Sequence, residues 1–269
     1  MEAIISFGKG APVFHINRVA FSIGNIEVYW YGLIIGLAIL VGVCLALVEI
    51  KKTELSLDDF LNMFLIGVPV AIVSARLYYV IFSWDMYKDN LLEIFNLRGG
   101  GIAIYGALIG VFLMIVIYTK VKKIPMGVPF DILGGIVPFC QAIGRWGNFV
   151  NGEAFGGKTN LPWAMTIQRE IYPLAETAYI VADSVHPTFL YESLWNLLTG
   201  IILWTYKKHK KFEGEIFCLY LISYGIGRFL IEGLRTDSLY LGSFRVSQLV
   251  ALATVLTGIA VIYKNRKKI

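Results

Sequence analysis

The sequence predicts an all-α polytopic membrane protein with seven transmembrane helices and a small extracytoplasmic head region. Three observations lead to this prediction. Hydrophobic residues make up 57% of the 269 residues and charged residues only 16%, with a mean hydropathy of +0.67, which is outside the range of soluble domains. Apolar runs of about twenty residues, the length that a helix needs to cross hydrocarbon, follow one another along the chain. The basic residues gather in the short connections between these runs.

The whole chain, 1–269, is expected to form one membrane domain. Its spans are expected at about residues 28–50, 60–82, 100–119, 128–147, 188–206, 215–234 and 246–263. Residues 1–27 have apolar stretches on both sides of the turn-forming dipeptide Gly24-Asn25, which predicts a surface hairpin or an amphipathic segment. No basic leader precedes the first run, so no cleavable signal peptide is expected.

Each of the first three spans has its own markers. The first opens with an interfacial aromatic cluster at residues 29–31 and closes with two lysines. The second holds Arg76 in an otherwise apolar run, and Pro69 is expected to kink it. The third follows a glycine run at residues 99–101 and ends in three lysines.

The remaining spans carry most of the polar groups. The fourth has Asp131 near its start and Arg145 near its end. Residues 148–187 follow it, too polar to span and rich enough in Pro, Trp and Tyr to fold as the head insertion. The fifth span starts after the motif His186-Pro-Thr-Phe-Leu-Tyr-Glu192, and the sixth ends in the charged stretch 225–235.

The basic residues orient the chain. The connections after spans one, three, five and seven hold two, three, four and four Lys or Arg, which is thirteen of the 24 in the chain. Such connections face the cytoplasm, so the amino terminus is expected outside and the carboxyl terminus inside. This topology brings polar groups from five spans to the outer leaflet: Tyr31, residues 99–105, Arg145, His186, Glu192 and Arg235.

The stretch 144–157, Gly-Arg-Trp-Gly-Asn-Phe-Val-Asn-Gly-Glu-Ala-Phe-Gly-Gly, indicates a binding site. Arg145 and Asn148 are three residues apart and share a helix face. A guanidinium fork beside amide donors suits the oxygens of a lipid phosphate. The structural alternative is an arginine that only reaches the interface above a loose turn. The further polar groups of Asn151 and Glu153 favour a functional cluster, because polar groups inside a membrane are costly.

A second cluster lies in the sixth span. Arg228, Glu232 and Arg235 are four and three residues apart and line one stripe of a helix. The alternative is a structural ladder of ion pairs that holds spans together. The deep arginines, Arg76, Arg145, Arg228 and Arg235, outnumber the deep carboxylates, Glu192 and Glu232. An excess of inward positive charge calls for an anion, and the anion that a membrane offers is a phospholipid headgroup.

Other classes of ligand are not indicated. The three cysteines, Cys44, Cys140 and Cys218, lie far apart in apolar runs, which excludes a disulfide framework or a zinc motif by spacing. No metal or organic cofactor is expected. The net charge of +5 sits in short connections between spans, so no nucleic-acid partner is expected either.

The motifs around Arg145 and Arg228 resemble the signature of the prolipoprotein diacylglyceryl transferase family of bacteria. The matching segments, in the order of the family, are Trp30-Tyr-Gly32, Tyr105-Gly-Ala-Leu-Ile-Gly110, residues 144–153, residues 186–192 and residues 227–235. The resemblance implies a multi-pass enzyme of the bacterial inner membrane that moves the diacylglyceryl group of phosphatidylglycerol onto the lipobox cysteine of a preprolipoprotein. It forms a thioether and releases glycerol phosphate, which is the first step of lipoprotein maturation. The implied partners are phosphatidylglycerol, the signal peptide with its lipobox cysteine, and membrane lipid.

The family's positions carry over as Tyr31, Arg145, Asn148, Glu153, Arg228, Glu232 and Arg235. The expected catalytic residues are Arg145, Arg228, Tyr105 and Glu153, and the expected substrate-binding residues are Tyr31, Asn148, Asn151, Glu232, Arg235, His186 and Gly106. Arg145 and Arg228 are expected to clamp the phosphate as charge grows on the leaving oxygen. One departure matters: many members have a histidine, suggested as the base, where this chain has Tyr105.

The substrate thiol must lose a proton, since the thiolate is the nucleophile. A tyrosine is a poor base, so two routes stay open. The arginines could favour the thiolate directly, with Tyr105 donating a hydrogen bond to the phosphate, which is the role we favour for it. Alternatively, Glu153 or His186 could accept the proton, directly or through water.

Several of these residues could instead have a purely structural role. His186 could simply cap the start of the fifth span, and Tyr31 could be an interfacial belt residue. Arg76 could pair with Asp131 or contact a second lipid. A rival function is a transporter or flippase that binds anionic lipid without chemistry, which inverted repeats would favour; the two halves of the chain show no convincing self-similarity. A membrane scaffold is disfavoured by the excess of arginine.

Overall fold

The computed structural model describes residues 2–8, 12–97, 100–171, 178–236 and 238–268. Gly99 and residues 172–177, which belong to the predicted glycine run and head region, lie outside the described residues. Two compact units divide the chain. The first unit consists of Met1–Val48 and Asp131–Ile269, and the second of Glu49–Phe130.

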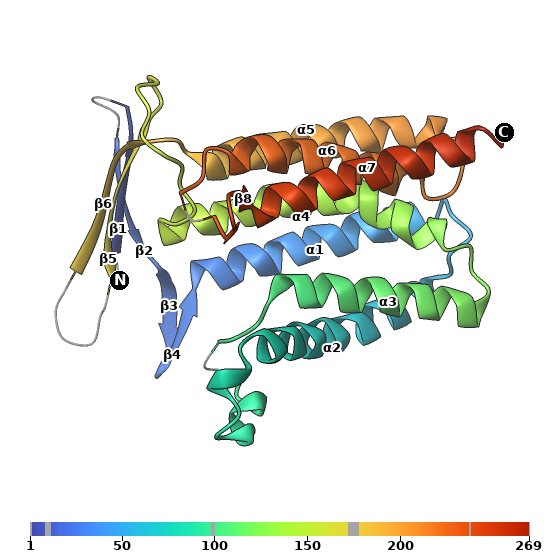
Figure 1. Cartoon of the computed structure of the whole chain (residues 1–269), viewed down its shortest axis with the longest axis horizontal. Coiled ribbons are helices and arrows are strands. Elements are labelled where there is room, and N and C mark those ends of the chain that lie inside the picture. Colours follow the sequence, from blue (N-terminus) through green and yellow to red (C-terminus); the bar gives the residue numbers. More distant parts are fainter. Residues whose placement is uncertain (1, 9–11, 98–99, 172–177, 237, 269) are drawn as a thin grey trace. The chain divides into compact units, whose positions relative to one another are not determined.

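Long helices lie side by side in the first unit (Figure 1). They are α1 (Trp30–Ile50), α4 (Gly127–Asn151), α5 (Thr188–Tyr206), α6 (Glu215–Glu232) and α7 (Val246–Arg266). Glycines allow the backbones to approach closely. A Cβ atom at Gly42 of α1 would lie 2.8 Å from the Cys140 sulfur of α4, and one at Gly200 of α5 would lie 2.9 Å from the Phe139 ring of α4.

An antiparallel sheet covers one end of α4 and α5 in this unit. Its strands are β1 (Glu2–Phe7), β2 (Val13–Asn17), β5 (Met165–Ile171) and β6 (Ala178–Val185), in the order β2-β1-β5-β6. Ile5 and Ile167 are opposite each other and fully buried. Their face packs with Phe189 of α5 and Phe149 of α4, so the sheet is anchored beside the polar end of α4.

Two short hairpins complete the first unit. β3 (Val19–Ile23) and β4 (Ile26–Tyr29) pair around Gly24-Asn25, where the sequence predicted a hairpin or an amphipathic segment. β7 (Tyr240–Leu241) and β8 (Phe244–Arg245) pair directly before α7. The pairing of β1 with β5, which joins residues 2–7 to the predicted head region, was not anticipated from the sequence.

The second unit is built on α2 (Leu57–Phe82) and α3 (Ile104–Lys122), which pack against each other. The Ser56 hydroxyl caps α2 by accepting a hydrogen bond from the Asp59 amide at 3.0 Å. The Tyr118 hydroxyl, near the end of α3, donates to the Asp59 carboxylate at 2.8 Å. Two 3-10 turns, η1 (Trp84–Met86) and η2 (Leu91–Phe95), lie in the connection between the two helices (Figure 1).

The predicted membrane class is confirmed in its coarser form. The chain is mostly helical, and among the described residues five helices, α1, α2, α3, α4 and α7, are long and apolar enough to cross a membrane. The other long helices of the described residues, α5 and α6, are not among these five. The prediction of an all-α chain is wrong for residues 2–29 and 165–185, where most of the strands lie.

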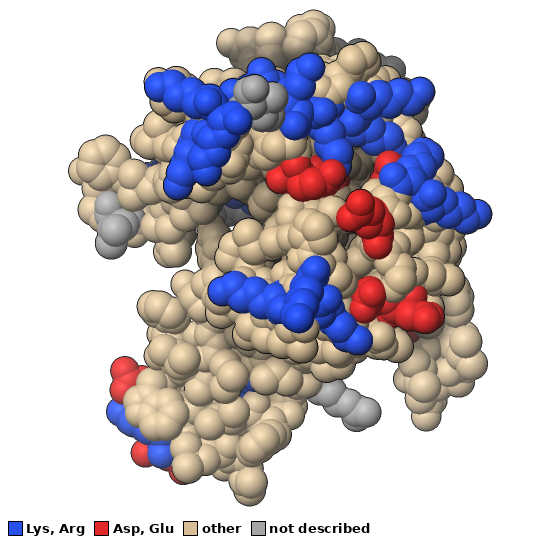
Figure 2. Space-filling view, turned by 90° about the vertical axis from the view of Figure 1, so that its right-hand side faces the viewer, with Lys and Arg blue, Asp and Glu red and all other residues tan. Residues whose placement is uncertain are grey.

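The connection between α5 and α6 and the end of α7 form a basic face. Figure 2 shows Lys and Arg side chains gathered there around a smaller number of acidic ones. Asp131 of α4 accepts hydrogen bonds from the backbone amides of Gly214 and Phe217, at 2.9 and 3.2 Å, and pairs with Lys210 at 3.0 Å. The alternative in which Asp131 pairs with Arg76 is therefore wrong. Asp131 caps α6 instead.

Candidate active site

Glu192 of α5 is the carboxylate on which three arginines converge. Its side chain is only 5% exposed. Its Oε2 atom lies 2.5 Å from Nη2 of Arg145 in α4. Its Oε1 atom lies 3.2 Å from Nη1 of Arg228 in α6 and 3.1 Å from Nη1 of Arg235, just beyond the end of α6. One buried carboxylate thus joins three segments that are far apart in the sequence.

Glu232 forms the second carboxylate of this group. It is 1% exposed and lies 2.6 Å from Nη2 of Arg228 and 4.0 Å from Nε of Arg235. The spacings of four and three residues place these side chains on one stripe of α6, as the sequence indicated. We call Arg145, Glu192, Arg228, Glu232 and Arg235 the arginine cluster. Three guanidinium groups meet two carboxylates within it.

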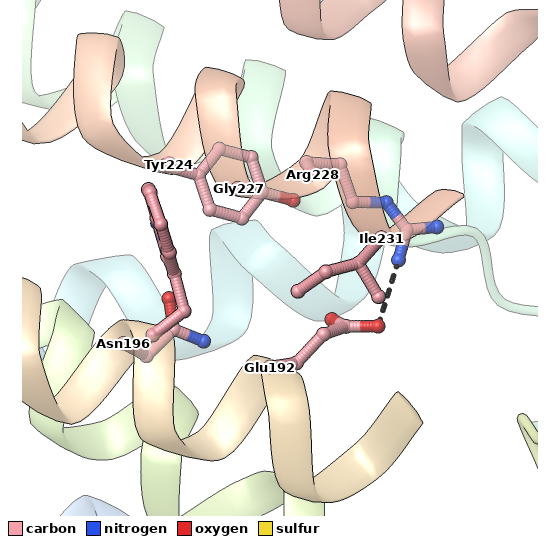
Figure 3. A pocket seen from close by; sticks show the side chains of 7 residues that line it. Glu192, Asn196, Tyr224, Gly227, Arg228 and Ile231 are labelled. Carbon is pink, nitrogen blue, oxygen red and sulfur yellow. Dashed lines mark hydrogen bonds and ion pairs between the residues drawn. The ribbon is translucent and has the colours of Figure 1, made fainter. Parts of the chain in front are cut away.

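A small cavity adjoins the cluster between α5 and α6 (Figure 3). Figure 3 shows the Arg228 guanidinium facing the Glu192 carboxylate, with Tyr224 and Asn196 toward the other end of the cavity. The cavity has a volume of about 10 Å³, which is space for one water-sized molecule. It is too small for a phosphate group. Gly227 permits this close packing, because a Cβ atom there would lie 2.3 Å from the Trp195 indole nitrogen.

The end of α4 extends the polar network. Nη1 of Arg145 donates to the Asn148 side-chain oxygen at 3.4 Å. The side-chain amides of Asn148 and Asn151 both donate to Oε1 of Glu153, at 3.1 and 3.2 Å. Glu153 therefore folds back onto the last turn of α4, and a continuous path of hydrogen bonds connects it to the arginine cluster.

The loop after α4 connects the ends of three helices through its backbone. His186 bonds to two neighbouring glycines: the Gly156 amide donates to the His186 carbonyl at 2.9 Å, and the His186 amide donates to the Gly157 carbonyl at 3.0 Å. The Gly157 amide donates to the carbonyl of Leu234, beyond α6, at 2.8 Å. These bonds hold the start of α5 and the end of α6 beside the end of α4, which is where the arginine cluster forms.

His186 has a side-chain partner of its own. Its Nδ1 atom lies 3.3 Å from the Tyr191 hydroxyl, which also accepts a hydrogen bond from the Trp163 indole at 2.9 Å. Tyr31 lies against α4 at Gly147, where an added Cβ atom would be 2.7 Å from its ring. Tyr31 thus contacts the turn of α4 that carries Arg145 and Asn148.

The first unit therefore brings together most of the residues expected from the sequence. The set joined by side-chain contacts is Arg145, Asn148, Asn151, Glu153, Arg228, Glu232 and Arg235. Tyr105 and Gly106 lie in α3 of the second unit, so their part in the site stays a prediction. Glu192, which was expected among the polar groups near the outer leaflet but not as a site residue, is the centre of the cluster. Its place at the end of the 186–192 motif was the available signal.

The same segments decide the family. A family model for prolipoprotein diacylglyceryl transferase matches residues 18–264, which is most of the chain. The chain belongs to the prolipoprotein diacylglyceryl transferase family. The match includes all the long helices and the whole arginine cluster, and it confirms the resemblance drawn from the motifs.

Relatives in this family are similar over almost their full length. A protein of Clostridioides difficile is 46% identical over 255 residues, covering 94% of this chain and 97% of the relative. A protein of Finegoldia magna is 45% identical, covering 94% and 98%, and one of Listeria monocytogenes is 43% identical, covering 96% and 93%. Each of these relatives is named phosphatidylglycerol–prolipoprotein diacylglyceryl transferase.

Proposed function

We propose that this chain transfers the diacylglyceryl group of phosphatidylglycerol to the lipobox cysteine thiol of a preprolipoprotein. The products are a thioether-linked lipopeptide and glycerol phosphate. The observation that carries the proposal is the arginine cluster: Arg145 and Arg228, from two helices, contact opposite oxygens of Glu192. A carboxylate and a phosphate are both recognised by guanidinium forks, so a cluster built around Glu192 is also suited to a lipid phosphate.

The reaction is a displacement at a glyceryl carbon. The thiolate forms a carbon–sulfur bond while the carbon–oxygen bond to the phosphate breaks, and the electron pair of that bond stays on the phosphate oxygen. Arg145 and Arg228 hold the phosphate and stabilise the charge that grows on it. Asn148 supplies a further donor. Glu232 orients Arg228 from the same helix, and Arg235, just beyond that helix, pairs with the same two carboxylates as Arg228. Glu192 keeps the arginines in place before the lipid binds.

The thiol proton needs an acceptor outside the arginine cluster. Glu153 is one candidate, since its carboxylate is oriented by two amides at the end of α4. His186 is the other, and its ring nitrogen contacts the Tyr191 hydroxyl. Either group passes the proton on to water. Tyr105 donates a hydrogen bond to the phosphate in this scheme, and Tyr31, Asn151 and Gly106 line the path of the substrate.

The proposal includes seven spans. α5 and α6 are 19 and 18 residues long, enough to cross most of a bilayer core of about 30 Å at 1.5 Å per residue. Their polar side chains are turned inward: Glu192, Ser193, Asn196 and Thr199 of α5 are buried. Leu194, Leu198 and Ile202 of the same helix are exposed. An apolar outer surface around a polar interior is what lipid requires.

The proposed orientation rests on the basic connections, and the proposed location rests on membership of the family. The amino terminus and residues 148–187 lie outside, the carboxyl terminus lies in the cytoplasm, and the protein resides in the inner membrane of a bacterium. The head residues then lie on the side of the membrane where exported preprolipoproteins emerge.

The test is an assay with the purified protein in phosphatidylglycerol vesicles and a lipobox peptide. We expect the peptide to gain the mass of one diacylglyceryl group and glycerol phosphate to be released in equal amount. A peptide with serine in place of cysteine, and vesicles of phosphatidylcholine, should give no product. Lipid movement across the vesicle membrane with an unmodified peptide would instead support the transporter alternative and refute the transferase.

A further inference from the structure

Arg76 of α2 is a buried cation in the second unit. It is 6% exposed, and a guanidinium has five N–H donors to satisfy. Nε donates to the Ile94 carbonyl at 2.8 Å, and Nη1 donates to the carbonyls of Gly100 and Gly101 at 2.9 and 2.8 Å. Nη2 donates to the carbonyls of Glu93 and Asn96 at 2.5 and 3.1 Å. The number of contacts equals the number of donors.

Among the described residues, the hydrogen-bond partners of Arg76 are all main-chain carbonyls. The ring of Tyr87 adds a cation–π contact, with the guanidinium carbon 4.9 Å from the ring centroid. The arrangement differs from the arginine cluster, in which carboxylates neutralise the charge. A buried guanidinium that binds five carbonyls determines the path of the backbone that supplies them. We call the segments 93–97 and 100–101, which supply these carbonyls, the carbonyl loop.

The carbonyl loop leads directly into α3. The Ala103 amide, at the start of α3, donates to the carbonyl of Ala75, the neighbour of Arg76, at 3.1 Å. Three residues further on, Gly106 lies so close to α2 that a Cβ atom there would be 2.4 Å from the Ser74 carbonyl oxygen. Tyr105 lies between these two contacts. Its side chain is half-buried and has no hydrogen bond among the described residues, so a shift of this backbone would move its hydroxyl.

We propose that Arg76 is a positioning residue that holds the carbonyl loop and the start of α3, and through them sets the place of the Tyr105 hydroxyl for the lipid phosphate. This inference rests on the proposed function. It also accounts for the glycine run, since a Cβ atom at Gly101 would lie 2.3 Å from Nη1 of Arg76. Figure 1 shows the connection that contains η1 and η2 at one end of α2.

Two neighbouring glycines provide a matched test. Gly101 has φ +73° and meets Arg76, whereas Gly100 has φ +84° and an added Cβ atom there would find nothing within 4 Å. Gly100→Ala and Gly101→Ala therefore impose similar backbone strain, but only Gly101→Ala displaces the guanidinium. We expect Gly101→Ala to raise KM for phosphatidylglycerol by about tenfold relative to Gly100→Ala, the effect of losing about one hydrogen bond of positioning. Equal KM values in the two variants would overturn the proposal.

Arg76→Lys tests whether the planar guanidinium group of Arg76 is needed or only its positive charge. Lysine keeps the charge but cannot bind five diverging carbonyls, so KM should rise as in Gly101→Ala. Combining Arg76→Lys with Tyr105→Phe should add little to the effect of Tyr105→Phe alone, because both changes remove the same contact. Fully additive effects on KM would show that Arg76 does not act through Tyr105.

Hydrogen–deuterium exchange separates this inference from the proposed function. Arg76→Lys should speed exchange of the Ala103 amide and of the carbonyl loop, with α2 and the first unit unchanged. Unchanged exchange at Ala103 and in the carbonyl loop would refute the positioning role of Arg76, whatever the effect on activity. A wild-type protein that leaves the lipobox peptide unmodified while this exchange effect is present would refute the transferase assignment instead.

Discussion

Glu192 occupies the position of an anion among three arginines. Arginines without a counterion would repel one another in a low-dielectric interior, and the buried carboxylate of Glu192 offsets this repulsion. It therefore sets how the arginines are spaced. Under the proposed function, a lipid phosphate must share or displace these contacts.

Glu192→Gln tests this role. A neutral amide cannot offset three guanidinium groups, so the arginines should move apart, and the initial rate of peptide modification should fall by about 100-fold or more. The free energy of unfolding should fall by up to about 3 kcal/mol. Thermal unfolding in detergent would show this as a lower melting temperature. Glu213→Gln is the control, since Glu213 is a more exposed acid that pairs only with Lys210. Near-normal rates in Glu192→Gln would contradict the central position of this carboxylate.

Tyr105→Phe distinguishes two roles for the residue that replaces the family's histidine. If Tyr105 donates one hydrogen bond to the phosphate, its loss should cost about tenfold in kcat/KM. Arg145→Ala should cost far more, because it removes half of the phosphate clamp. A loss in Tyr105→Phe as complete as that in Arg145→Ala would mean that Tyr105 carries the thiol proton.

At the scale of elements, α6 is fixed at both ends. Its last turn contributes Arg228 and Glu232 to the arginine cluster, and its first turn is capped by Asp131 of α4. Glu215, in that first turn, is fully buried and pairs with Arg266 at the end of α7. Contacts at the basic face hold the first turn of α6 in place. They therefore help to fix where Arg228 and Glu232 lie in its last turn.

Lys210 completes the cap of α6. Burial lowers the pKa of Lys210, but its bonds to Glu213 and Asp131 more than offset this, and the pKa is raised above the ordinary lysine value. A raised pKa means that the folded state favours the charged form, so the stabilisation is present through the neutral range. It is lost only as the pH rises through that raised pKa.

Asp131→Ala should loosen α6. Two backbone amides and a lysine lose their acceptor, so we expect a loss of about 2 kcal/mol in stability, measured as a lower melting temperature. The rate of peptide modification should fall as well, because α6 carries Arg228. Asp85→Ala is the matched control: its carboxylate is 92% exposed and pairs with Lys88, so a change within about 0.5 kcal/mol is expected. A similar small change in Asp131→Ala would argue against the cap.

The helices were more predictable than the strands. A helix occupies every apolar run identified in the sequence, and α5 has the expected bounds of 188 and 206. Continuous apolar runs identify such helices without tertiary information. β1 and β5 are short, and their pairing depends on residues more than 150 positions apart, as in Ile5 with Ile167. No local pattern encodes a contact at that separation.

At the scale of the whole molecule, the arrangement in the membrane is the largest open prediction. Asn25→Cys in the β3–β4 turn and Lys268→Cys beyond α7 place thiols at two exposed positions. In intact cells, a membrane-impermeant maleimide should label Asn25→Cys and not Lys268→Cys. The unmodified chain, with cysteines only inside α1, α4 and α6, provides the background. The reverse labelling pattern would invert the topology.

Most residues of the candidate site could be predicted from the sequence, but the central place of Glu192 could not. The spacing of Arg228, Glu232 and Arg235 indicated one helical stripe, and Arg145 with Asn148 indicated another face. The sequence could not say which carboxylate would receive the arginines, since that depends on how α4, α5 and α6 pack. Arg76 was equally hidden: a partner set of main-chain carbonyls leaves no pattern in the side chains of the sequence.

β1 lies in the middle of the four-stranded sheet, between β2 and β5. β5 follows β1 in the chain only after helices α1 to α4. During synthesis, β1 can therefore pair with β2 at once, but its pairing with β5 must wait until the ribosome has passed residue 171.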